Sequence, residues 1–194
     1  MTRTFARPEK ITFVKAARED ATADTAAIEA TVKTILSDVR EKGDAAVRSY
    51  AMTFDKNCPE ILEVSKAERV QALDLLDHQT REDTEFAIGN VRSFAEAQLK
   101  TILPLEVELR PGLHLGHRVI PIETIGAYVP GGRYPLLSAP IMTLVPAKVA
   151  GCAEVIACLP PTAHPAMIAG CHLSGADRIF RVGGTQAIAA MAYG

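Results

Sequence analysis

The stretch Ile125-Gly126-Ala127-Tyr128-Val129-Pro130-Gly131-Gly132 decides the fold class that is predicted for this chain. It starts as a short apolar run, which is typical of a buried strand, and it ends in a glycine turn. A helix is expected next, over residues 138–150. The same order of strand, turn and helix recurs to the end of the chain. It predicts an α/β fold, with a parallel sheet that helices cover on both faces.

The later elements follow from apolar runs that stand between turn residues. Strands are predicted over residues 155–159 and 178–182, and helices over residues 164–174 and 185–193. Pro146 lies inside the helix that is predicted over residues 138–150. Because proline has no backbone N–H, we expect it to kink or interrupt that helix.

Ahead of the sheet, residues 20–100 are predicted to be mainly helical. Apolar residues recur at helical spacing over residues 28–39, and Gly43 then marks a helix end. Asp44 is expected to cap a second helix, which continues to Phe54.

Two more helices and a pair of strands complete this first part of the chain. Ser65 and Glu68 have the spacing of a capping box, which predicts a helix start, and Thr80 is expected to begin a further helix. Apolar and charged residues alternate over residues 105–110, as in a half-buried strand, and residues 113–119 alternate again.

The composition excludes several classes of protein. The chain has 194 residues, of which 48% are hydrophobic, and 21 Lys and Arg stand against 23 Asp and Glu. The apolar content is too high for a disordered chain, and the balanced charge argues against binding to nucleic acid. No run of about 18 apolar residues is present, so no membrane span is expected. The N-terminus has no apolar signal segment, and a cytoplasmic location is therefore expected.

The cysteines do not have the spacing of a metal site. They are Cys58, Cys152, Cys158 and Cys171. None of them forms a Cys-x-x-Cys pair, and the last three lie among aliphatic residues, as buried thiols do. No Ser/His/Asp or Cys/His arrangement can be read from residue order. The sequence therefore assigns no catalytic residue and no metal ligand within the chain.

Two glycine turns are the candidate ligand-binding features. One is the turn at residues 130–132, and the other is Val182-Gly183-Gly184-Thr185-Gln186. Glycine lets the backbone approach a ligand closely, and the start of the following helix offers free N–H groups to an anion. On spacing alone, tight connections between a strand and a helix are the favoured explanation of both turns.

Two polar side chains lie at these turns. Arg133 can bind a carboxylate, phosphate or sulfonate through two hydrogen bonds, although a solvated loop arginine fits the pattern as well. Gln186 stands at the start of the last helix, where its amide can both donate and accept hydrogen bonds. Its alternative role is that of a polar residue at a helix start.

The sequence resembles the histidinol dehydrogenase family over residues 25–194. The resemblance rests on motifs that follow one another in the family's order and are specific as a set. They are residues 39–46, Phe54-Asp55, residues 126–132, residues 146–151, Pro160-Pro161, residues 175–177 and residues 182–190.

The resemblance implies an alcohol dehydrogenase that depends on zinc and NAD and oxidises histidinol to histidine through an aldehyde. Tyr128 and Gln186 match the family's cofactor residues, which implies that they contact NAD. It also implies an intertwined homodimer with incomplete Rossmann-like domains, in an aldehyde dehydrogenase-like architecture. The expected domains are residues 1–127, a helical arm with part of the first α/β domain, and residues 128–194, the first part of the NAD-side domain.

Three departures from the family pattern change what is expected of this chain. Family members are more than twice as long, so their zinc ligands and Glu-His acid/base pair are expected beyond residue 194. We therefore expect a fragment that is inactive alone, or alternatively a non-catalytic binding or assembly module. Ala95 replaces a histidine of the biosynthetic members, and Arg133 stands in a turn that is uncharged there. Both resemble relatives similar to sulfopropanediol dehydrogenase and imply that Arg133 contacts a small anionic diol.

Overall fold

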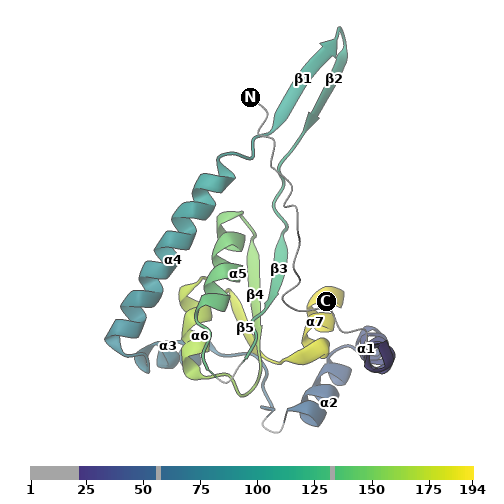
Figure 1. Cartoon of the computed structure of the whole chain (residues 1–194), viewed down its shortest axis with the longest axis vertical. Helices are drawn as coiled ribbons and strands as arrows, with labels where there is room; N and C mark the ends of the chain where they lie inside the picture. The colour runs from purple at the N-terminus through teal and green to yellow at the C-terminus, as the bar shows by residue number, and fades with distance from the viewer. Residues whose placement is uncertain (1–21, 56–57, 132–133) are drawn as a thin grey trace, which may run out of the picture.

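The computed structural model describes residues 22–55, 58–131 and 134–194. Helices and strands alternate in the second half of the chain, after a mainly helical first half (Figure 1). In chain order the elements are α1 (Thr22–Lys42), α2 (Asp44–Phe54), α3 (Lys66–Asp74), α4 (His78–Leu99), β1 (Leu105–Arg110), β2 (Leu113–His117), β3 (Thr124–Tyr128), α5 (Ser138–Val149), β4 (Glu154–Leu159), α6 (Pro165–Leu173), β5 (Arg178–Arg181) and α7 (Gly184–Tyr193).

The sheet that organises the molecule is parallel and has the strand order β3-β4-β5. Tyr128 is in register with Cys158, and Cys158 with Phe180, so the carboxyl ends of the strands lie at one edge. Helices α5 and α6 cover one face, and α7, together with α1 and α2, covers the other (Figure 1). The predicted α/β fold with a parallel sheet between helices is confirmed.

The strand residues alternate between two apolar clusters. Ala127 and Leu159 belong to the cluster under α5 and α6, whereas Tyr128 and Cys158 pack in the cluster under α7. Burial on both faces explains why these strands have continuous apolar sequences. The predicted domain boundary between residues 127 and 128 falls inside β3, and the division into two domains stays a prediction.

One predicted helix start is confirmed, and two others differ from the prediction. Ser65 and Glu68 exchange hydrogen bonds in the capping box that begins α3. Gly43, with a φ of 55°, is itself the N-cap of α2, so Asp44 is the first helical residue and not the cap that we expected. Asp77 accepts a hydrogen bond from the backbone N–H of Thr80 over 2.9 Å, and this cap moves the start of α4 ahead of Thr80.

The β1–β2 hairpin is exposed on both faces. The expected half-burial of residues 105–110 is wrong, because the hairpin extends past the end of α4 and away from the sheet (Figure 1). Leu105 and Leu109 are 52% and 59% exposed, and β2 ends at His117 instead of Val119. Alternation in sequence predicted the strands, but it carried no information about what covers them.

Pro146 lies within a continuous helix. The expected interruption of α5 is wrong, since the helix runs from Ser138 to Val149. Leu144 and Val145 are both 0% exposed, and burying each of them is worth about 1.5–3 kcal/mol. That gain is comparable to the roughly 3 kcal/mol that an internal proline costs a helix.

None of the helices in the described part of the chain is both long and apolar enough to cross a membrane.

Candidate functional site

The glycine turns meet at the edge of the sheet where the strands end. A Cβ atom on Gly131 would lie 2.7 Å from Cγ of Pro160, and one on Gly183 would lie 3.4 Å from the Cα of the same proline. Pro160 directly follows β4, while the two glycines follow β3 and β5. The connections after three neighbouring strands therefore converge, which is where ligands bind in open α/β sheets.

Helix α7 begins at this edge. Gly183 occupies the N-cap position and has no side chain with which to cap the helix. The N–H groups of the first turn are thus left to a ligand or to water, and a helix N-terminus attracts anions. Gly184 has a φ of +71°, and a Cβ there would approach Oε1 of Gln186 to 2.8 Å. Glycine at this position leaves room for the Gln186 amide.

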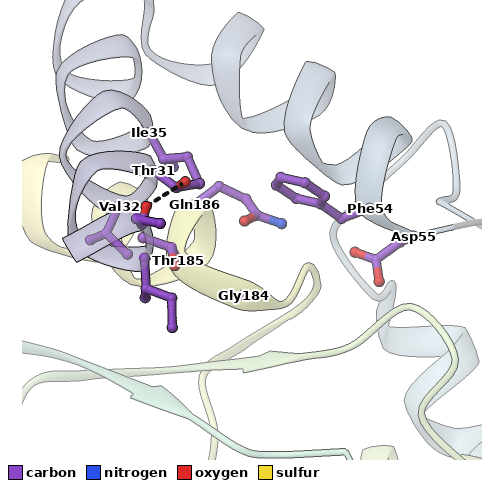
Figure 2. A pocket seen from close by; sticks show the side chains of 10 residues that line it. Thr31, Val32, Ile35, Phe54, Asp55, Gly184, Thr185 and Gln186 are labelled. Atoms are coloured by element: carbon purple, nitrogen blue, oxygen red, sulfur yellow. Dashed lines mark hydrogen bonds between the residues drawn. The ribbon is translucent and has the colours of Figure 1, made fainter. Parts of the chain in front are cut away.

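Gln186 lines a cleft of about 490 Å³ next to this helix start. The side chain is 1% exposed, and in Figure 2 its amide extends toward Phe54 across the cleft. Within the described residues, the amide has no hydrogen-bond partner. The amide atoms are not fully enclosed, since Ser174 Oγ is the only fully buried side-chain N or O atom without a partner among the described residues. An amide that reaches the cleft without a protein partner leaves its donors and its acceptor to water or to a ligand. The amide is therefore available to a ligand.

The cleft has one aliphatic wall and one mixed wall. The aliphatic wall comes from α1 and includes Ile28, Val32 and Ile35. The mixed wall holds Phe54, whose ring stacks on Tyr50 with centroids 5.7 Å apart and is 55% exposed, and the carboxylate of Asp55. An aromatic face, a carboxylate and an amide around one cleft suit a ligand with a planar ring and several polar groups.

The predicted site residues lie as follows. Tyr128 ends β3, is half-buried, and packs in the same apolar cluster as Val182 and Ala187. Tyr128 and Gln186 therefore share an edge and a face of the sheet. The cleft that Gln186 lines is formed without Tyr128, so a shared cleft stays a prediction. Arg133 lies outside the described residues, and its contact with substrate also stays a prediction.

Sequence reasoning did not identify Phe54 and Asp55 as site residues. Phe54 was expected only to end a helix, and the Phe54-Asp55 pair served only as a motif. The structure places both at the end of α2, against the start of α7 (Figure 2). A signal was present, because an aromatic residue and an acidic residue stand together at the end of a predicted helix.

The buried thiols are not candidate nucleophiles. Burial raises the pKa of Cys158 to about 11 and the pKa of Cys171 to about 12, so both stay protonated near neutral pH. Among residues 22–55, 58–131 and 134–194, no group of three or more His, Cys, Asp or Glu side chains could hold a metal ion. That the zinc ligands lie beyond residue 194 stays a prediction.

Comparisons with known proteins show the family and the fold of this chain. Residues 18–194 match the model of the histidinol dehydrogenase family. The chain belongs to the histidinol dehydrogenase family. Its fold is that of a solved member, the histidinol dehydrogenase from Elizabethkingia anophelis, with a TM-score of 0.79 at 30% identity over 93% of this chain and 40% of that one.

Similar proteins within the family have different names. The histidinol dehydrogenase homolog 1 of Mesorhizobium japonicum is 46% identical over 87% of this chain and 34% of its own length. The sulfopropanediol 3-dehydrogenase of Ruegeria pomeroyi is 38% identical over 95% of this chain and 43% of its own length. The chain thus spans less than half the length of either relative.

Proposed function

We propose that this chain forms the NAD-binding part of an alcohol dehydrogenase of the histidinol dehydrogenase family. The observation that carries the proposal is the amide of Gln186, which is 1% exposed, lacks a partner among the described residues and extends into the cleft. NAD would accept a hydride from the alcohol carbon when it is bound. The contribution of this chain is to bind and orient the cofactor.

The residues at the sheet edge divide this task. The N–H groups at the start of α7 attract the anionic pyrophosphate, because Gly183 leaves them uncapped. The Gln186 amide matches a polar edge of the nucleotide, since it can donate and accept. Tyr128 offers a ring and a phenol on the same edge and face. Zinc would be held by residues beyond 194.

For the substrate we propose histidinol or a related small polar alcohol, such as a sulfonated diol. The relatives with histidinol dehydrogenase and sulfopropanediol dehydrogenase names support both. Arg133 favours an anionic diol, because a guanidinium binds a sulfonate and repels the cationic amine of histidinol. Ala95, the other departure from the biosynthetic members, does not line this cleft. It lies on α4, which packs against α5 and α6, whereas the cleft is formed by α1, α2 and α7.

We also propose that the protein acts as a cytoplasmic homodimer. All four cysteines are free thiols, as is usual in a reducing compartment. The exposed leucines of the β1–β2 hairpin, Leu105 and Leu109 among them, support a protein contact on that arm. A non-catalytic binding or assembly module remains the alternative. Dehydrogenase activity toward either alcohol, measured on a full-length protein that contains this chain, would exclude it.

Calorimetric titration of the chain with NAD tests the proposal. Gln186→Met keeps the length of the side chain but removes its hydrogen bonds, and we expect about tenfold weaker binding, which corresponds to roughly 1.4 kcal/mol. Gln98→Met, at an exposed position near the end of α4, is the matched control and should bind like the unchanged protein. Absence of NAD binding, or equal binding by the two variants, would contradict the proposal.

A further inference from the structure

Asp55 is held in place by the end of α2. It is the C-cap of that helix, and its backbone N–H donates to the carbonyl oxygen of Ala51 over 2.8 Å. Its own carbonyl oxygen accepts a hydrogen bond from the backbone N–H of Cys58 over 3.2 Å. The backbone of Asp55 is therefore held on both sides, and its carboxylate lines the cleft (Figure 2).

The carboxylate of Asp55 is not used by the rest of the described chain. It takes part in no hydrogen bond or ion pair there, although it is only half exposed. Other carboxylates near the sheet do have partners, for example Glu63 with Arg178 at 2.9 Å. A carboxylate can only accept hydrogen bonds, so a ligand that matches it must bring donors.

Two features of the cleft restrict which ligand could bring hydrogen-bond donors to Asp55. Phe54, adjacent to Asp55, presents a half-exposed ring that suits stacking with a base. The start of α7, which lines the same cleft with Gly184 and Gln186, favours an anionic group beside it. A nucleotide combines a base, an anionic phosphate and a sugar with adjacent hydroxyl donors, and the sugar lies between the other two.

We propose that Asp55 accepts hydrogen bonds from the hydroxyl groups of the adenosine ribose and thereby selects NAD over NADP. A 2′-phosphate on that ribose removes a donor and places a second negative charge beside the carboxylate. Carboxylates have this role on other nucleotide-binding sheets, although from a different position in the fold. The inference rests on the proposed NAD-binding function and adds the residue that sets cofactor choice.

The test compares the binding of NAD and NADP to the chain by calorimetry. The unchanged protein should bind NAD at least about tenfold more tightly than NADP. Asp55→Asn removes the charge at nearly constant size, and it should bring the two dissociation constants to within about threefold. Glu60→Gln removes one exposed carboxylate five positions along the chain, outside the cleft, and should leave the preference for NAD intact.

The outcomes separate this inference from the function on which it rests. If the unchanged chain binds NAD but Asp55→Asn keeps the full preference, Asp55 does not set the choice and the inference is wrong. If Asp55→Asn weakens NAD and NADP equally, the carboxylate acts on another part of the ligand, and the inference is again wrong. If the unchanged chain binds neither nucleotide, the proposed function fails as well. Circular dichroism of Asp55→Asn should show the unchanged fold, because the replaced carboxylate has no partner in the described chain.

Discussion

Arg181, at the end of β5, donates a hydrogen bond from Nη1 to Oε1 of Glu68 over 2.6 Å. The other carboxylate oxygen of Glu68 accepts the backbone N–H of Ser65 over 2.8 Å, within the capping box of α3. These interactions lower the pKa of Glu68 to about 2. The hydrogen bond from Arg181 has the largest effect, and the hydrogen bonds with Ser65 come next. One carboxylate thus starts a helix and joins it to the sheet.

This arrangement predicts acid sensitivity that depends on Glu68. Its pKa is lowered from 4.5 to about 2 in the folded chain, so its contribution is complete above pH 4.5 and is lost as the pH falls toward 2. Glu68→Gln keeps the cap but loses the ion pair. Because the side chain is 39% exposed, we expect a loss of no more than about 1 kcal/mol near neutral pH.

Urea unfolding at several pH values measures this effect. The free energy of unfolding of Glu68→Gln should fall less steeply between about pH 5 and pH 2 than that of the unchanged chain. Glu96→Gln, on the exposed side of α4, should follow the unchanged chain. Parallel pH curves for all three proteins would show that the Glu68–Arg181 contact does not affect stability.

Gly184→Ala should damage both stability and cofactor binding. The backbone φ of +71° is unfavourable for alanine by about 1–2 kcal/mol, and the new Cβ would lie 2.8 Å from Oε1 of Gln186. We expect a lower melting temperature and weaker NAD binding. In Gly89→Ala the new Cβ meets nothing within 4 Å inside α4, so this control should be neutral or slightly stabilising. Equal effects of the two substitutions would argue against a special role for Gly184.

The thiols should differ sharply in reactivity. Cys158 and Cys171 are buried and have raised pKa values of about 11 and 12, whereas Cys58 is half-buried near the end of α2. Ellman's reagent at about pH 7.5 should label Cys58 first and the buried thiols only after denaturation. Cys58→Ser should remove the fast phase. A fast phase that persists in that variant would place a second reactive thiol at the surface.

Zinc should not bind to this chain in a stoichiometric amount. The described residues contain no cluster of three or more potential ligands, and the family resemblance puts the ligands beyond residue 194. Without its metal, the chain should show no dehydrogenase activity toward histidinol or a sulfonated diol. Elemental analysis after dialysis checks the first statement, and one tightly held zinc per chain would refute it.

The order of the elements and the local signals at their ends could be predicted from the residues alone. Apolar runs between glycine turns predicted the parallel sheet, since strands buried on both faces need continuous apolar sequence. The Ser65–Glu68 capping box was readable because its hydrogen bonds join residues three positions apart. Gln186 could be placed at a helix start for the same local reason.

The tertiary structure alone decided what covers each face and which distant residues meet. Periodicity showed that residues 105–110 alternate, but only the fold shows that the hairpin leaves the body of the molecule. Gln186 and Asp55 line one cleft because α7 packs against α1 and α2. That contact depends on how the helices pack across the sheet. No local pattern records it, because the side chains involved lie more than a hundred positions apart.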